Sequence, residues 1–78
     1  MGLFTKTENA VYSITQQGRE AEEQFAGRGI KGKVLTGLVE CSGATTVDRL
    51  VGETGISREA LKNVLERLKA NGYVQSQG

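Results

Sequence analysis

The chain has 78 residues, with ten Lys and Arg side chains against nine Asp and Glu, so its formal net charge is +1. This length allows one domain with one small core, and the near-neutral charge excludes a polybasic or an acidic tail. Histidine is absent and Cys41 is the single cysteine, which excludes an internal disulfide and a zinc cluster within one chain.

The composition also bears on chemistry and location. Without histidine, and with a cysteine that has no base to activate it, we expect no catalytic residue, no metal and no cofactor, and the chain is not predicted to be an enzyme. No apolar run approaches the roughly 18 residues of a membrane span, and MGLFTKTENA lacks the apolar core of a secretory signal. We therefore expect a cytoplasmic protein with no membrane partner.

The N-terminal third predicts a strand followed by a helix. Residues 1–8 show no periodicity and are expected to be disordered, and residues 9–26 carry the two elements. AVYSIT has strand composition, and Thr15 is the expected N-cap of a helix over QQGREAEEQFA. Ala21 and Phe25 share one face of that helix, which is a candidate homodimer surface or, equally, packs on the domain's own core.

The stretch GRGIKGKV, from Gly27 to Val34, matches seven positions of the phosphate-binding pattern G-x-x-x-x-G-K-[ST]. Val34 replaces the hydroxyl residue that would hold Mg²⁺, and no buried strand precedes the stretch, so no nucleotide is expected. We predict instead a hinge over residues 27–32, with Ile30 pointing inward.

Residues 33–72 predict a helical core, and residues 45–72 within it have the pattern of a helix-turn-helix. The first helix ends at Gly43, and the second begins with Thr45 as its N-cap and ends at Gly55. The third begins with Ser57 as its N-cap and ends at Gly72. Its apolar stripe at 3.6-residue spacing is the clearest signal in the chain, formed by Leu61, Val64, Leu65 and Leu68. Residues 73–77 then have strand character.

Two helices joined by a tight turn that holds a glycine form a helix-turn-helix, and TTVDRLVGETGISREALKNVLERLKANGYV resembles the winged helix-turn-helix family of small bacterial and archaeal transcription regulators. The resemblance covers Lys31 to about Gln75. It implies an α+β, mostly helical fold, with a core of three or four helices and a small two-stranded sheet. AVYSITQQGREAEEQF resembles the strand and helix that follow the wing in this family, so these pieces occur in permuted order. We predict that residues 11–14 pair with residues 73–77.

The resemblance implies sequence-specific binding of double-stranded DNA by a recognition helix over about residues 57–71, as in a transcriptional regulator. The side chains of this helix outside the apolar stripe include four candidates for base edges: Arg58, Lys62, Asn63 and Arg67. Five further residues are candidates for the DNA backbone: Arg28, Lys31, Lys33, Ser57 and Lys69. Glu59 repels phosphate and, with the near-neutral charge, favours the alternative, a winged-helix module that binds protein within a larger assembly and not DNA.

Overall fold

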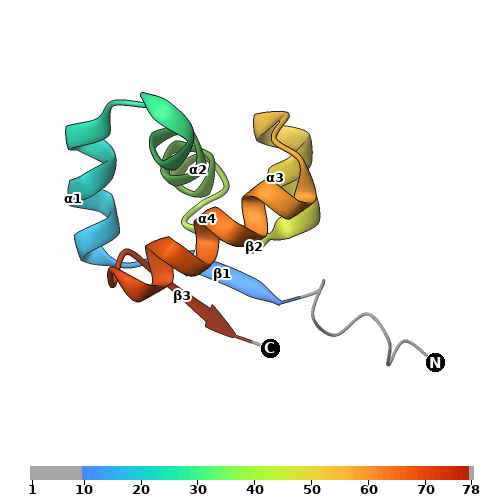
Figure 1. Cartoon of the computed structure of the whole chain (residues 1–78). Coiled ribbons are helices and arrows are strands. Elements are labelled where there is room, and N and C mark those ends of the chain that lie inside the picture. The colour runs from blue at the N-terminus through green and yellow to red at the C-terminus, as the bar shows by residue number, and fades with distance from the viewer. Residues whose placement is uncertain (1–9, 78) are drawn as a thin grey trace.

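A three-stranded antiparallel sheet and four helices make up residues 10–77, the part of the chain that the structure, a computed structural model, describes. The predicted disordered stretch 1–8 lies outside the described residues. The fold is α+β and mostly helical, as predicted, with α4 running diagonally from beside α3 toward the lower end of α1 (Figure 1). In chain order the elements are β1 (Val11–Ile14), α1 (Gln16–Phe25), α2 (Gly29–Glu40), β2 (Ala44–Thr46), α3 (Val47–Thr54), α4 (Arg58–Ala70) and β3 (Val74–Gln77).

The sheet has the strand order β2-β1-β3. The predicted pairing of the N-terminal and C-terminal strands is confirmed, because Ile14 lies opposite Val74 and Val11 lies opposite Gln77. The sheet is larger than the predicted two strands, because β2 pairs with the other side of β1, with Val11 opposite Thr46. Three residues are too few to show an alternation of polar and apolar side chains, so the sequence pattern did not indicate β2.

The start of α3 differs from the prediction by one residue. Thr45 lies in β2 opposite Tyr12, and the N-cap is Thr46, whose Oγ1 accepts a hydrogen bond from the Arg49 N–H at 3.3 Å. The two adjacent threonines offer the same capping hydroxyl. Both lie in β2, and Thr46 caps the helix because it is the last residue of the strand and directly precedes Val47, where α3 begins.

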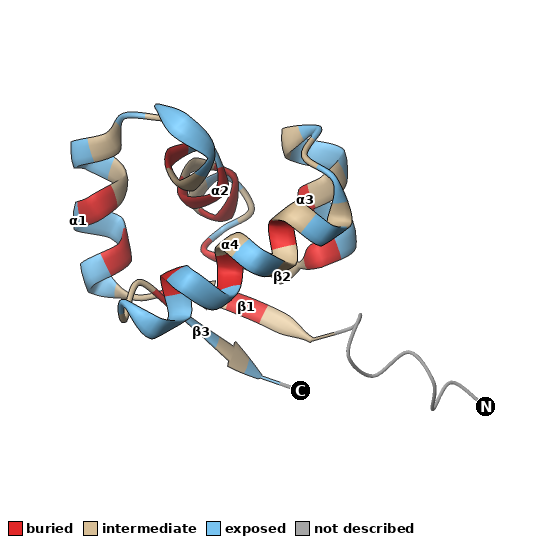
Figure 2. Ribbon diagram, in the orientation of Figure 1, coloured by how far each residue is buried: buried red, intermediate tan, exposed pale blue. Residues whose placement is uncertain are grey.

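The core lies between the sheet and the inner faces of α2, α3 and α4. The stripe predicted in the last helix is confirmed for its three leucines, which have no exposed surface, whereas Val64 is only half-buried. Figure 2 shows the buried segments of the helices turned toward one another and the outer side of α4 exposed. The fully buried side chains are Val34, Leu35, Leu38, Val47, Leu50, Leu61, Leu65, Leu68 and Val74.

The predicted hinge over residues 27–32 is wrong, because α2 already begins at Gly29. The turn consists of three residues, in which Ala26 and Gly27 have positive φ angles of 51° and 75°. Gly32 lies inside α2, and a Cβ atom there would come within 3.1 Å of the Phe25 Cβ and 3.0 Å of the Gly27 carbonyl carbon. The glycine therefore allows α1 and α2 to approach closely and does not make this segment a linker.

A second close approach fixes α1 against the C-terminal end of α4. The Thr15 N–H donates to the Tyr73 carbonyl at 2.9 Å. The Thr15 Oγ1 hydroxyl donates to the Gly72 carbonyl at 2.6 Å and, more weakly, to the Tyr73 carbonyl at 3.0 Å. The same Oγ1 caps α1 by accepting from the Gly18 N–H at 3.0 Å. Ala21 is buried in the domain's own core, so its part of the proposed dimer face packs within the chain.

Candidate nucleic-acid interface

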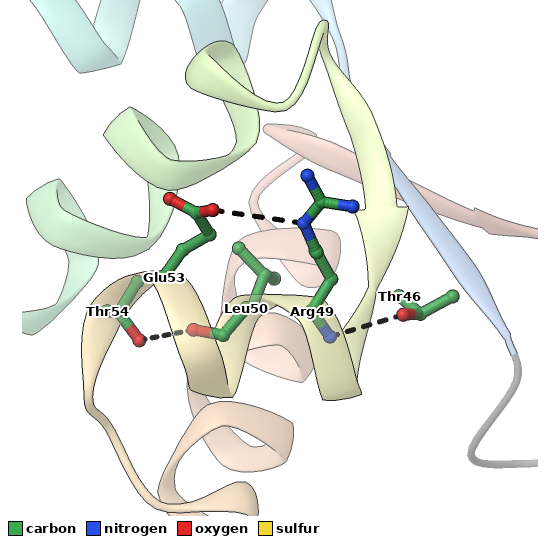
Figure 3. Close-up of polar contacts among 5 residues, drawn as sticks. All are labelled: Thr46, Arg49, Leu50, Glu53 and Thr54. Carbon is green, nitrogen blue, oxygen red and sulfur yellow. Dashed lines mark hydrogen bonds and ion pairs between the residues drawn. The ribbon is translucent and has the colours of Figure 1, made fainter.

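The turn between α3 and α4, where a helix-turn-helix is predicted, is fixed by a glycine and by side-chain hydrogen bonds. Gly55 ends α3 in the left-handed region at φ 74°, where a side chain would be strained. The Thr54 hydroxyl donates to the Leu50 carbonyl at 2.7 Å and accepts from the Ile56 N–H at 3.2 Å. Figure 3 shows the first of these bonds and the ion pair between Arg49 and Glu53, 3.8 Å apart, on the same helix.

The beginning of α4 is capped as predicted. The Ser57 Oγ accepts from the Ala60 N–H at 3.3 Å, and α4 then runs from Arg58 to Ala70. Because Thr54 and Ser57 satisfy backbone groups on both sides of Gly55, the turn holds the two helices in a defined relation. The Ser57 hydroxyl, a candidate phosphate contact, is thus also a structural cap.

The outer surface of α4 has two flanks, which follow from 3.6 residues per turn. Asn63 and Arg67 are exposed and lie four residues apart on the flank that faces α1 and the start of α2. Lys62 and Lys69 lie on the other flank, beside Glu66, which contacts β1 through Tyr12. The candidate residues of this helix are therefore divided between two sides.

A groove of about 580 Å³ separates the first flank of α4 from the turn between α1 and α2. Arg28 and Lys31 line it on one side, and Asn63 and Arg67 line it on the other. The Arg28 Nε also donates to the Phe25 carbonyl at 3.2 Å, which directs this side chain across the turn. The structure thus brings together four of the nine predicted DNA-contacting residues, from two segments about 35 positions apart in the chain.

Arg58 is engaged within the domain. Its guanidinium forms an ion pair and hydrogen bond with the Asp48 carboxylate in the first turn of α3, and about two fifths of its side chain is exposed. The contact ties the start of α4 to the start of α3. Arg58 would therefore have to exchange a carboxylate partner before it could contact a guanine.

Lys33 lies apart from the other candidates. It lines a separate groove between α2 and α3, together with Glu40 and Glu53. Carboxylates in that groove oppose the approach of a phosphate. The predicted cluster of three basic residues at the start of α2 is thus divided, with Arg28 and Lys31 on one side and Lys33 on another.

Glu66 places a carboxylate on the outer surface of α4. Tyr12 donates its hydroxyl to Glu66 Oε2 at 3.4 Å. Burial, and then the negative charge of Glu66 and this hydrogen bond, raise the pKa of Tyr12 above its ordinary value of 10.0. The contact holds Glu66 toward the sheet, on the flank opposite the groove.

The apolar floor of the groove was not predicted from the sequence. It consists of the apolar side chains of Phe25, Ile30, Ala60 and Val64. Ile30 was expected to point inward, and this is wrong: it is 50% exposed, because it lies on the first turn of α2 beside the groove. Val64 was assigned to the core stripe. Its position at the edge of that stripe, four residues after Ala60, is the signal that could have indicated the floor.

No helix among residues 10–77 is both long enough and apolar enough to cross a membrane. Within the same residues, no three His, Cys, Asp or Glu side chains come together in an arrangement that could hold a metal ion. Comparison of the chain with protein-family models, with curated proteins and with solved structures gives no match.

Proposed function

We propose that this chain binds double-stranded DNA through α4, as a helix-turn-helix protein of the winged type. One observation carries the proposal: Arg28 and Lys31 of the α2 start face Asn63 and Arg67 of α4 across one groove, beside a capped helix-turn-helix. Side chains from two separate elements thus offer cationic and amide groups on one surface. This is the combination that a recognition helix and a backbone contact require.

Each side chain has a chemistry that suits its place. Asn63 can pair with an adenine through two hydrogen bonds, and Arg67 can pair with a guanine in the same way. Arg28 and Lys31 lie at the positive end of α2, where backbone phosphates bind favourably. Lys62 and Lys69, on the other flank, supply contacts to the opposite phosphate strand.

The arrangement of the sheet supports the winged type. β1 lies between β2 and β3, and α1 follows it, so the N-terminal strand and helix occupy the place of the pieces that follow a wing in that family. Val11 and Gln77 pair at one end of the sheet, where a wing loop would join the two strands. On this proposal the order of the pieces is permuted.

The second candidate is a winged-helix module that binds protein and not DNA. Glu59 and Glu66 both lie on the exposed surface of α4, and Arg58 is paired with Asp48. Two carboxylates on the proposed recognition helix oppose a phosphate backbone. This candidate becomes the better account if duplex DNA does not bind.

The test is an NMR titration of the full chain with a mixed-sequence duplex of about 15 base pairs, one and a half helical turns. We expect amide shifts over residues 57–67 and at Arg28 and Lys31. The logarithm of the affinity should fall with the logarithm of salt concentration at about −0.9 per neutralised phosphate. The absence of shifts over residues 57–67 at low salt would refute DNA binding.

Variants separate the proposed face from general electrostatics. Arg67→Ala and Lys31→Ala should each weaken duplex binding, whereas Lys33→Ala should have little effect, because Lys33 lies in the groove with Glu40 and Glu53. Equal losses from Lys31→Ala and Lys33→Ala would show that the face has been assigned wrongly.

A further inference from the structure

The groove between α4 and the start of α2 has an apolar floor that the proposed contacts with DNA do not require. Ile30 is the large hydrophobic side chain most exposed among the described residues, at 50%. Phe25, Ala60 and Val64 line the same groove and are each half-buried, and the groove has a volume of about 580 Å³. This volume lies within the range of about 300–1,000 Å³ that is typical of ligand-binding clefts. Phosphates and sugars gain little from such a floor.

The rim of the groove is positively charged. Arg28 and Lys31 rise from the α2 side, and Arg67 rises from α4. Among the described residues that line this groove, none is acidic, whereas the separate groove near Lys33 contains Glu40 and Glu53. Apolar contact at the floor and positive charge at the rim favour a ligand that is apolar along its centre and acidic along its edges.

We propose that this groove docks an acidic amphipathic helix from a partner protein. A helix presents apolar side chains at i, i+3, i+4 and i+7 along one face, which can pack on the apolar floor of the groove. Asp and Glu beside that stripe would lie near Arg28, Lys31 and Arg67. Because Asn63 and Arg67 also belong to the proposed DNA face, the partner helix and DNA would compete for the groove. Only this competition rests on the proposed function.

A direct binding measurement tests the docking site without DNA. The probe is a synthetic peptide of about 14 residues, with leucines at i, i+3, i+4 and i+7 and with Glu at the flanking positions. The full chain, labelled with ¹⁵N, is titrated with this peptide at moderate salt. We expect amide shifts at residues 25–31 and 60–67. The absence of binding at millimolar peptide would overturn the proposal.

Two matched comparisons identify the site. Lys31→Glu should weaken peptide binding about threefold to tenfold through charge reversal at the rim, whereas Lys33→Glu, on the same helix but outside the groove, should change it less than about twofold. Ile30→Ser, at a half-exposed position, should weaken binding about fivefold through the loss of apolar contact. If the two lysine substitutions weakened peptide binding equally, or if Ile30→Ser did not weaken it, the proposed location of the docking site would be overturned.

Two further peptides test the class of ligand. A peptide with the same leucines and with Lys in place of Glu should bind at least tenfold more weakly, and so should a peptide that keeps Glu but has Ser in place of leucine. Binding of either peptide as tight as that of the acidic one would overturn the stated chemistry. Because these titrations contain no duplex, failure of DNA binding and failure of the docking site are distinguishable.

Discussion

Replacement of Gly18 by alanine should destabilise the domain, although alanine is the better helix former. Gly18 lies in the first turn of α1, directly against the Tyr73 carbonyl. A Cβ atom at this position would lie 2.1 Å from the Tyr73 oxygen and 2.6 Å from the Ile14 Cγ1. An ordinary contact between carbon and a carbonyl oxygen is about 3.3 Å or longer, so α1 and Tyr73 must separate by about 1 Å.

The size of the effect follows from what this separation breaks. The Tyr73 carbonyl accepts from the Thr15 N–H at 2.9 Å and from its hydroxyl at 3.0 Å. Overpacking costs about 1–3 kcal/mol, and each weakened hydrogen bond adds about 1 kcal/mol. The better helix propensity of alanine returns about 1 kcal/mol. The net loss in free energy of unfolding is about 2–4 kcal/mol, which corresponds to a fall in Tm of about 10–30 °C for a domain of this size.

The assay is thermal and urea unfolding followed by far-UV circular dichroism, with Gly52→Ala as the matched control. Gly52 is also helical and exposed, but a Cβ atom there would meet nothing within 4 Å. Gly52→Ala should therefore stabilise the domain by about 0.5–1 kcal/mol. The two substitutions are chemically identical and should have opposite signs. If Gly18→Ala raised Tm as Gly52→Ala does, the close approach of α1 to Tyr73 would be refuted.

Two further predictions concern charged groups. In a Tyr73→Phe background, absorbance titration should place half-ionisation of Tyr12 above pH 10.0, because burial and Glu66 raise its pKa. Glu66→Gln should lower the pKa of Tyr12 without restoring its ordinary value. If the titration midpoints with and without Glu66→Gln did not differ, the contact between Tyr12 and Glu66 would be contradicted. Since the unfolded chain loses this proton first, the stability contribution is complete below about pH 10 and is lost as pH rises further. Asp48→Asn removes the carboxylate paired with Arg58. This substitution should change the free energy of unfolding by at most about 1 kcal/mol and should tighten duplex binding. Weaker duplex binding would contradict the proposed contact of Arg58 with DNA.

The sequence revealed those parts of the fold that depend on neighbours along the chain. The Ser57 cap and the leucine stripe of α4 were predicted correctly, because capping and 3.6-residue periodicity are local properties. The pairing of β1 with β3 was also predicted, from the resemblance rather than from periodicity. β2 was missed because a strand of three residues depends on the strand beside it. The prediction of a hinge was wrong because Gly32 was interpreted as a sign of flexibility, whereas it permits close packing of α1 against α2.

The candidate site could be predicted only in part, for a related reason. Asn63 and Arg67 were correctly expected on the exposed surface of one helix, since that surface follows from the stripe opposite. Their position across from Arg28 and Lys31 depends on how α2 packs against α4, and a single sequence does not indicate the relative orientation of two helices. The pairing of Arg58 with Asp48 is likewise a tertiary contact between two helices.

The groove depends on contacts that lie away from its own lining. Thr15 and Gly18 fix the beginning of α1 to Tyr73, and Gly32 allows the end of α1 to approach α2. Phe25 is the last residue of α1 and Arg28 comes three residues later, so the position of α1 affects both the floor and one rim of the groove. Loss of the α1 contact at Gly18 should therefore disturb the flank of α4 that lines the groove. The flank with Lys62, and the packing of α3 on α4 through their leucines, should change less. Amide shifts in Gly18→Ala below its Tm provide the measurement, and shifts spread equally over both flanks would contradict this link.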